Sequence, residues 1–457
     1  MARVIEQLAT LGLSLILAGC AEAQSALSVP TAMAAHEICS SVFVSRLDSE
    51  RAFTSTVGPQ LGPLKPFLRM SIDPVARSVT ASLGSAAARR AVYQGAYGCI
   101  VSEVEPTLPV AHIAASPGPS NIAEPTAKSE EPMALSRALD LAFAENPNGP
   151  RRRTYAAVIV HDGKIVAERY ARGMSATTPL HGWSMSKSMT NALLGVLVQQ
   201  GRLDMFAPAP ASEWRDQADP RHAITADDLL RMRSGLDVGQ SLTSNWSAPF
   251  DPANQIMFAK PNMAAAAASR PLKATPRTVW TYSDGNTAIL GRLIRERTGG
   301  PLEAQVFARR ELFDRLGMGP VTLETDASGS PIGATQIYAS ARDWARLGQL
   351  FLDNGLVAGH RVLPDGWVNY STSLTPGSER FGYGAGFWIS RPLNDQNPRM
   401  PAGSFMARGA RGQYVVVVPS ARLVVVKLGD ADTPRGDFDQ MAHVVTAAAR
   451  WEAQTND

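Results

Sequence analysis

Residues 181–201 read HGWSMSKSMTNALLGVLVQQG, and this stretch combines an apolar periodicity with a pair of reactive side chains. From Met189 to Leu197 the apolar residues recur at the spacing of one helical face, which predicts a helix packed against a core. Ser184 and Lys187 stand three residues apart, so a helix brings the lysine amine within reach of the serine hydroxyl. A nucleophile beside a base is the arrangement that covalent catalysis requires.

The apolar residues after Lys187 predict that this lysine is partly buried. Burial disfavours the ammonium form, so we expect a lowered pKa for Lys187, which makes it a proton acceptor near neutral pH. The alternative is a serine that caps the helix and a lysine whose amine reaches the surface. A Ser-x-x-Lys sequence also occurs by chance, so its meaning depends on partners elsewhere in the chain.

Composition limits the classes of function. The chain has 457 residues, 45% of them hydrophobic, which is enough for one large core and a smaller unit. The net charge is +3 and no dense basic cluster is present, so we expect no nucleic-acid partner. The 7 histidines show no metal-ligand spacing, and the chain has neither a glycine-rich phosphate loop nor a dinucleotide fingerprint. We therefore expect no cofactor and no metal.

The first residues predict a targeting segment. Arg3 precedes an apolar run that ends in Leu17-Ala18-Gly19-Cys20, and the run is too short to span a bilayer. Residues 1–20 resemble a bacterial lipoprotein signal, which implies a lipid anchor on Cys20 and a periplasm-facing place in the cell envelope. The alternative is an ordinary signal peptide cleaved near Ala23.

The remaining cysteines fit an exported protein. If Cys20 carries lipid, Cys39 and Cys99 are left as a possible pair, and we predict a disulfide between them. The alternative is two separate buried thiols.

Composition also divides the chain. Residues 21–103 are expected to form a small α+β extension, with strand-like centres at residues 42–44 and 79–83. Residues 104–132 are rich in proline, alanine and serine, which predicts an extended and poorly ordered linker. Residues 133–457 form the main domain.

The main domain has strand signals at both ends and helical signals between them. Residues 155–160 and 164–170 predict one hairpin, residues 414–418 and 423–428 predict a second, and residues 381–389 predict a further strand. The pattern indicates an α+β fold, in which an antiparallel sheet completed by both chain ends is flanked by helices and interrupted by a helical region.

Two further stretches offer partners for Ser184. In the first, Tyr282 precedes a turn and a helix, so its phenol can point into a cleft and relay a proton; the alternative is a core tyrosine. In the second, Gly409 and Ala410 lie where a strand is expected to begin. A backbone N–H there can form an oxyanion hole with the N–H of Ser184; the alternative is a simple glycine turn before an edge strand.

The three stretches together resemble the serine β-lactamase and penicillin-binding-protein superfamily, whose pattern is Ser-x-x-Lys, then Tyr-x-Asn or Ser-x-Asn, then a Lys-Thr-Gly-like strand. The resemblance runs from about residue 155 to residue 449. The segments GWSMSKS (residues 182–188) and ARGARGQY (residues 407–414) look most like class C β-lactamase-like serine hydrolases, among them 6-aminohexanoate-dimer hydrolases and related esterases.

The resemblance implies a role for each matching residue. It implies Ser184 as the acylated nucleophile, Lys187 as its base, Tyr282 as the proton relay, and the N–H groups of Ser184 and Ala410 as the oxyanion hole. Two departures stand out, because Ala407 replaces the lysine of Lys-Thr-Gly and Asp284 replaces the asparagine of Tyr-x-Asn.

Substrate binding is expected at Asp284, Gly409, Arg408 and Arg411. The two arginines are candidates for recognising an anion, and the alternative is that they face solvent.

We therefore expect a serine hydrolase that cleaves a small ester or amide through a Ser184 acyl-enzyme. One alternative is a β-lactamase or D,D-peptidase acting on peptidoglycan, which the loss of the lysine at position 407 disfavours. A second is a catalytically silent envelope-binding protein of the same fold. The sequence leaves the substrate and the oligomeric state open.

Overall fold

The structure is a computed structural model. It describes residues 28–84, 87–102, 108–109, 113–116, 118, 120–125, 131–241, 250–390 and 400–455. The predicted signal, residues 1–20, and the predicted lipid site at Cys20 lie outside this range. Among the described residues, no helix is both long and apolar enough to cross a membrane.

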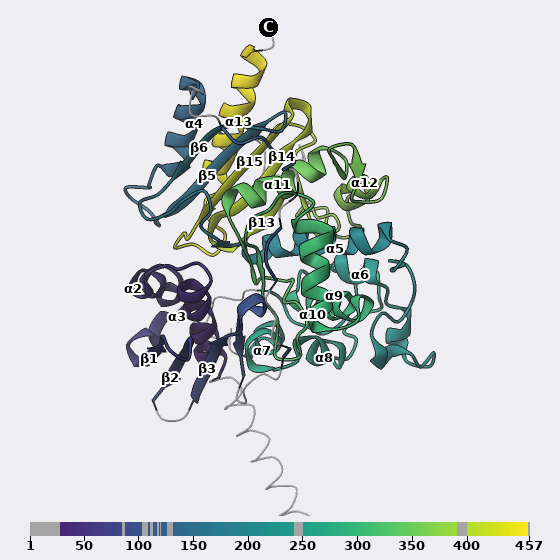
Figure 1. The fold of residues 1–457 in the computed structure, drawn as a ribbon. Helices are drawn as coiled ribbons and strands as arrows, with labels where there is room; N and C mark the ends of the chain where they lie inside the picture. Colours follow the sequence, from purple (N-terminus) through teal and green to yellow (C-terminus); the bar gives the residue numbers. More distant parts are fainter. Residues whose placement is uncertain are drawn as a thin grey trace, which may run out of the picture.

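A six-stranded antiparallel sheet forms the centre of the main domain (Figure 1), in the order β12-β13-β14-β15-β5-β6. In that order the strands are Trp388–Ile389, Phe405–Gly409, Gln413–Val418, Leu423–Gly429, Thr154–His161 and Lys164–Tyr170. Strand β5 comes first in the domain and pairs with β15, which comes last, so that Val158 lies opposite Val426. The predicted hairpins β5–β6 and β14–β15 are confirmed, as is closure of the sheet by both ends of the domain.

Helices cover both faces of the sheet (Figure 1). Helices α4 (Met133–Phe143) and α13 (Phe438–Thr455) pack on one face, and α11 (Ala341–Leu352) packs on the other. Alternate residues of β14 therefore contribute to two different cores, with Val415 and Val417 in one and Val416 in the other. This explains why β14 and β15 are continuous valine-rich runs rather than alternating patterns.

A helical region follows β6 and contains the quoted stretch. Its helices are α5 (Ser186–Gln199), α6 (Ala226–Leu230), α7 (Pro252–Ala259), α8 (Met263–Ala268), α9 (Asp284–Thr298), α10 (Pro301–Phe307) and, further on, α12 (Trp367–Thr372). A small sheet has the order β7-β9-β8, with strands Leu180–His181, Ile337–Ala339 and Thr322–Leu323. Helix α5 is buried along almost its whole length, as its apolar periodicity predicted.

The N-terminal domain is a separate α+β unit with its own core. A helix over residues 28–43, α2 (Ser49–Ala52) and α3 (Gly58–Leu61) pack with a four-stranded antiparallel sheet. Its strands are β1 (Leu68–Asp73), β2 (Ser78–Leu83), β3 (Ala87–Tyr93) and β4 (Cys99–Val101). The predicted Cys39–Cys99 disulfide is confirmed and joins the first helix to β4.

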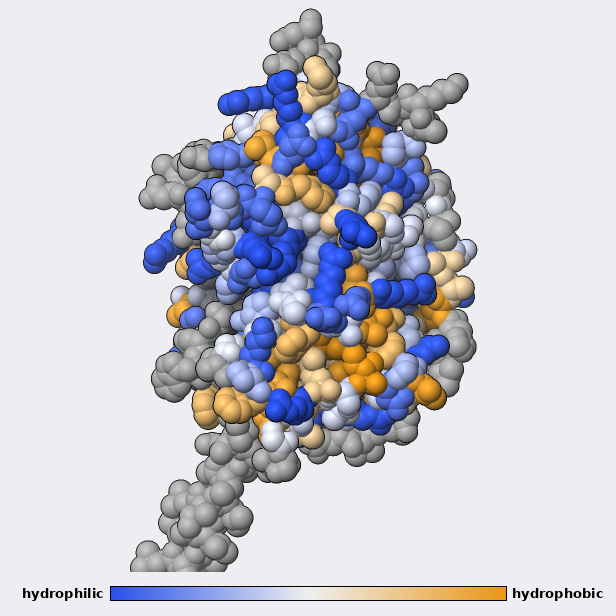
Figure 2. Space-filling model, turned by 90° about the vertical axis from the view of Figure 1, so that its left-hand side faces the viewer, coloured by the Kyte–Doolittle hydropathy of each residue, from blue (hydrophilic) through white to orange (hydrophobic). Residues whose placement is uncertain are grey.

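The surface of the molecule on the side of this domain is mixed in character. Figure 2 shows hydrophilic residues over much of that face, whereas hydrophobic ones gather in its lower part, where the N-terminal domain lies. Among the described residues of the N-terminal domain, the exposed large apolar side chains are Phe67 and Val75.

Three local predictions were wrong. Residues 42–44 end the first helix or follow it and form no strand, because Ala34, Ala35 and Ile38 bury one helical face and this packing outweighs the strand propensity of Val-Phe-Val. Residues 381–389 are mostly turns, since Gly382 and Gly386 adopt left-handed backbone angles, and only the last two form β12.

The third wrong prediction concerns the linker expected over residues 104–132. Part of this segment is packed rather than poorly ordered. Ile122 is buried in the main core. The N–H of Ala123 donates to the Gly163 carbonyl at 2.6 Å, and its carbonyl accepts from the N–H of Ile165 at 2.9 Å. The burial of one apolar side chain and these two backbone hydrogen bonds fix this part of the linker beside β6.

Candidate active site

Ser184 lies in a tight turn that leads into α5. The turn covers Trp183–Met185, follows β7, and places Lys187 in the first turn of the helix. Trp183 has a positive φ of 49°, a conformation that costs a bulky residue about 1–3 kcal/mol and persists only where the surroundings fix it. At Gly182, a Cβ atom would lie 2.2 Å from the Trp344 ring, so only glycine fits there. Packing on both sides thus determines where the Ser184 hydroxyl points.

The Lys187 amine contacts three acceptors. Its Nζ atom donates to Ser184 Oγ at 3.2 Å, to the Ala334 carbonyl at 3.0 Å, and to a carboxylate oxygen of Asp284 in a shorter contact. Three donated hydrogen bonds match the three protons of an ammonium group. The predicted Ser184–Lys187 pair is therefore formed, and the resting amine is charged.

The direction of the Lys187 pKa shift is the opposite of the prediction. Burial alone lowers the pKa of an amine, but the Asp284 carboxylate, together with the Tyr282 phenol, outweighs burial and raises the pKa of Lys187 above its ordinary value of 10.5. Sequence reasoning considered burial alone because Asp284 is 97 residues away in the chain.

Tyr282 and Asp284 lie side by side at the start of α9. Ser283 caps this helix, and Asp284 is its first residue, where the helix dipole favours a carboxylate. The Lys187 Nζ atom lies 4.8 Å from the centre of the Tyr282 ring. The structure thus brings Ser184, Lys187 and Tyr282 together as predicted. Asp284, expected at the substrate, instead pairs with Lys187.

Strand β13 brings Gly409 and Ala410 to the Ser184 turn. A Cβ atom on Gly409 would lie 2.3 Å from the Gly182 carbonyl oxygen and 3.1 Å from the Trp183 Cβ atom, so only glycine allows this approach. Ala410 follows directly. The segment predicted to supply the second oxyanion donor therefore lies against the segment that supplies the first.

The two arginines predicted to bind substrate point elsewhere. Arg408 alternates with Ala407 and Gly409 along β13, so it lies on the other face of the sheet, over the rings of Tyr414 and Phe438. Arg411 is buried, and its guanidinium donates to Asp430 and to the Ser55 carbonyl of the N-terminal domain. Both assignments to substrate binding are therefore corrected.

The other serines beside Ser184 have structural partners. Ser186 Oγ accepts from the N–H of Ile337 at 3.2 Å, and Ser188 Oγ donates to the Gly386 carbonyl at 2.6 Å. Neither hydroxyl contacts a lysine amine in the described part of the chain. Ser184 is thus the serine of this stretch with an adjacent amine.

Sequence reasoning missed His181 and Glu37. His181 is the first residue of the quoted stretch and stacks on Trp183, with ring centres 4.2 Å apart. Glu37 of the N-terminal domain lies 3.2 Å from the Nδ1 atom of His181. No spacing in the sequence relates these two residues, because they belong to different domains.

Aromatic side chains surround Tyr282. The ring of Trp388 lies 5.2 Å from that of Tyr282, and the ring of Tyr383 lies 5.5 Å from it. Trp280 stacks on the exposed ring of Phe381 at 5.1 Å. These residues come from two segments, residues 280–282 and 381–388, and they form an apolar wall beside Tyr282.

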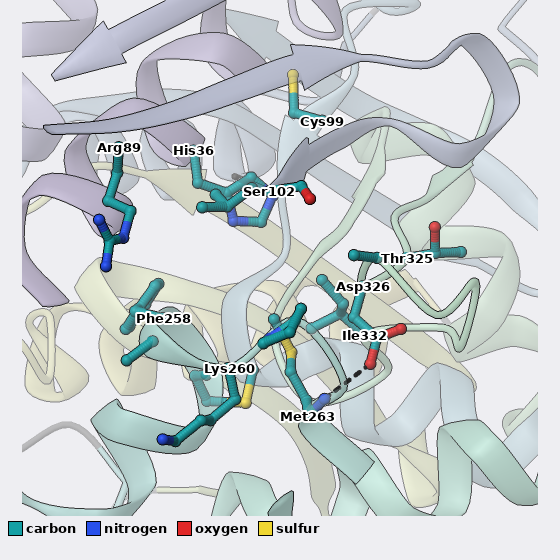
Figure 3. A pocket seen from close by; sticks show the side chains of 15 residues that line it. His36, Arg89, Cys99, Ser102, Phe258, Lys260, Met263, Thr325, Asp326 and Ile332 are labelled. Carbon is teal, nitrogen blue, oxygen red and sulfur yellow. Dashed lines mark hydrogen bonds between the residues drawn. The ribbon is translucent and has the colours of Figure 1, made fainter. Parts of the chain in front are cut away.

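A cavity of about 500 Å³ lies between the N-terminal domain and the helical region (Figure 3). His36, Arg89, Cys99 and Ser102 line one side, and residues including Phe258, Lys260, Met263 and Ile332 line the other. None of Ser184, Lys187 and Tyr282 lines it. No group of three or more candidate metal ligands is found among the described residues.

Comparison with known proteins finds a matching family and several relatives. The model of the family described as beta-lactamase matches residues 139–450. A 6-aminohexanoate-dimer hydrolase of Paenarthrobacter ureafaciens is 25% identical over 304 residues, which cover 62% of this chain and 74% of the relative.

Two solved structures share the fold. A Bacillus anthracis protein, provisionally assigned as a 6-aminohexanoate-dimer hydrolase, superposes with a TM-score of 0.57 at 22% identity and covers 74% of this chain and 89% of its own. EstCE1, a hydrolase with promiscuous acyltransferase activity, gives a TM-score of 0.56 at 16% identity and covers 69% and 98%.

Proposed function

Because the chain belongs to the β-lactamase family of serine hydrolases, we propose that it hydrolyses a small ester or amide through an acyl-enzyme on Ser184. The observation that carries the proposal is the contact between Ser184 Oγ and the buried amine of Lys187, which itself pairs with Asp284. A buried lysine beside a serine hydroxyl has a clear use in proton transfer and little use in a purely structural helix.

The first step has to free the amine of a proton, because the Lys187 ammonium cannot accept one. This proton leaves to solvent as pH rises, which leaves a neutral amine beside the Asp284 carboxylate. The amine then accepts the Ser184 proton while Oγ bonds to the substrate carbonyl carbon, and the carbonyl π electrons move to oxygen. The Ser184 and Ala410 N–H groups are the proposed donors to that oxyanion.

Collapse of the tetrahedral intermediate breaks the bond to the leaving group. The leaving oxygen or nitrogen takes the proton from Lys187, and Tyr282, beside the amine, is the proposed relay. Water then attacks the acyl-enzyme with the same residues in reversed roles, which returns Ser184 to its starting state and releases the acid.

Two features favour simple esters or amides over β-lactams. Ala407 stands where the Lys-Thr-Gly pattern has its lysine and is buried, so it supplies no cation for a substrate carboxylate. The aromatic wall beside Tyr282 suits an apolar chain or ring. The name of the Paenarthrobacter ureafaciens relative, a 6-aminohexanoate-dimer hydrolase, supports a linear amide as one substrate class.

The test is turnover by the purified chain of p-nitrophenyl butyrate, nitrocefin and the linear 6-aminohexanoate dimer, beside Ser184→Ala. We expect ester or amide turnover, a fluorophosphonate adduct at Ser184 by mass spectrometry, and neither in Ser184→Ala. Preferred turnover of nitrocefin would indicate a β-lactamase. An absence of both turnover and adduct would indicate a silent binding protein.

We also propose that the chain is exported and anchored by lipid at Cys20. The Cys39–Cys99 disulfide supports this location, because such bonds persist in oxidising compartments. Cys20→Ala is expected to release the protein from the membrane fraction, and unchanged fractionation would contradict the anchor.

A further inference from the structure

Both oxyanion segments contain a residue in a strained backbone conformation. Trp183, which precedes Ser184, has a φ of 49°, and Arg411, which follows Ala410, has a φ of 61°. Non-glycine residues keep such angles only where neighbouring groups hold them. The groups that hold these two residues therefore determine the direction of the neighbouring N–H groups.

The N-terminal domain contacts the first of these segments through Glu37. The carboxylate of Glu37 is buried and lies 3.2 Å from His181 Nδ1, while its other oxygen accepts from Gln336 Nε2 at 3.0 Å. The His181 ring is stacked between Trp183 and Tyr338, at 4.2 and 4.6 Å. A chain of direct contacts thus runs from Glu37 through His181 to Trp183, one residue from the nucleophile.

The surroundings of this pair suit a fixed geometry. His181 Nε2 donates to the Thr335 carbonyl at 2.9 Å, and Nδ1 lies 3.2 Å from the Glu37 carboxylate, so both ring nitrogens face an oxygen atom. Burial raises the pKa of Glu37, but His181, His36 and Gln336 outweigh burial and hold the pKa below its ordinary value. Contacts at both ring nitrogens of His181 and at both carboxylate oxygens of Glu37 fix the orientation of the two side chains.

The same domain contacts the second segment through residues 55 and 56. The Ser55 carbonyl accepts from the Arg411 guanidinium, and Thr56 Oγ1 donates at 2.5 Å to Asp430, the ion-pair partner of Arg411. The cavity of Figure 3 lies between the N-terminal domain and the helical region, and His36, the neighbour of Glu37, lines it. The N-terminal domain thus reaches both segments of the proposed oxyanion hole.

We propose that the N-terminal domain positions the oxyanion hole, with Glu37 as the positioning residue for the Ser184 turn. The proposal rests on the proposed function, because it assumes that Ser184 is acylated. Glu37 acts through His181 and Trp183 and touches no reacting atom. Its loss is therefore expected to lower kcat, which depends on the direction of the Ser184 N–H, and to leave KM almost unchanged.

The test compares Glu37→Gln with Glu324→Gln. Glu324 is a glutamate that is as buried as Glu37. It accepts hydrogen bonds from two groups of the N-terminal domain, Ser40 Oγ at 2.7 Å and the Cys99 N–H at 2.8 Å, but it does not contact the Ser184 turn. Steady-state kinetics with p-nitrophenyl butyrate, the rate of fluorophosphonate labelling and the melting temperature are measured for each.

For Glu37→Gln we expect kcat and the labelling rate to fall about 10- to 100-fold with KM within about twofold. For Glu324→Gln we expect a lower melting temperature but, below it, kcat within about twofold of the unaltered chain. Unchanged kcat in Glu37→Gln, or an equal loss in Glu324→Gln, overturns the positioning role.

A further variant keeps the test decisive if Glu37→Gln does not fold. Glu37→Asp retains the charge with a shorter side chain and is expected to give an intermediate kcat; unaltered kcat in it overturns the proposal. If the unaltered chain is labelled at Ser184 and the Glu37 variants have unaltered kcat and labelling rates, only the positioning role is overturned. An unaltered chain that is never labelled overturns the proposed function as well.

Discussion

Lys187 shows how far one residue can be predicted from its neighbours in the sequence. Its burial and its contact with Ser184 follow from helical spacing, and both are present in the structure. Its pKa does not follow, because the group that raises it, Asp284, belongs to another helix. The sequence pattern marked Asp284 as a departure from Tyr-x-Asn but held no information about which side chain it would meet.

Asp284→Asn is expected to shift the pH dependence of acylation. Only the neutral amine accepts the Ser184 proton, so the rate rises as pH increases through the Lys187 pKa. Removing the carboxylate that raises this pKa leaves burial as the main influence, and the rise moves to lower pH. The measurement is kcat/KM for p-nitrophenyl butyrate between about pH 5 and pH 10.

The matched control is Asp343→Asn, which removes a buried carboxylate at the start of α11 that accepts from the Gly319 N–H. We expect it to lower stability and to leave the pH profile in place. If the profile of Asp284→Asn also stays in place, Lys187 is not the titrating base.

Among the elements, β13 and the Ser184 turn are the pair whose approach builds the site. The direction of the Arg408 side chain could have been predicted from the sequence, because alternation along a strand places it on the other face of the sheet from Ala407 and Gly409. The direction of Arg411 was not, because it depends on Ser55. Long valine-rich strands and the central helix were predicted well, whereas residues 42–44 and 381–389 were mispredicted because packing and glycine turns outweigh short-range propensity.

Gly409→Ala is expected to separate β13 from the Ser184 turn. The new Cβ atom would lie 2.3 Å from the Gly182 carbonyl oxygen, so one backbone must move. A displacement of this size at reacting groups costs about 100-fold in kcat. In the control Gly319→Ala, the nearest atom is Asp343 Oδ2 at 3.7 Å, an ordinary contact, and we expect kcat within about twofold. Equal kcat in the two variants would show that this approach is not needed for catalysis.

At the scale of the whole molecule, the division into an N-terminal unit and a main domain was visible in the sequence, but their contacts were not. Composition separated the two, and cysteine arithmetic predicted the disulfide, which the structure contains. The contacts of Glu37 with His181 and of Ser55 with Arg411 join residues that no local pattern relates. Sequence reasoning therefore found the proposed reacting groups and the separate N-terminal unit, but it missed the contacts between them.

The double variant Cys39→Ser with Cys99→Ser is expected to destabilise the N-terminal domain by about 4 kcal/mol, the chain-entropy value for a loop of 60 residues. Urea unfolding followed by circular dichroism reports the whole chain. Fluorescence reports the main domain, because all 8 tryptophans lie outside residues 28–102. The single variant Ser102→Ala, next to the same strand, is the control. Coincident urea midpoints for the double variant and the unaltered chain would contradict a stabilising role for the bond.

The pairing of β5 with β15 also sets an order of events during synthesis. The N-terminal domain and α5 emerge early, so Ser184 and Lys187 exist before β13, which begins at Phe405, has been made. Strand β5 has no partner on its β15 side until residues 423–429 arrive. Domains generally fold in the order in which they leave the ribosome. The nascent chain therefore carries Ser184 without the segment of its proposed oxyanion hole on β13, and the complete proposed site forms only when the last strands are added.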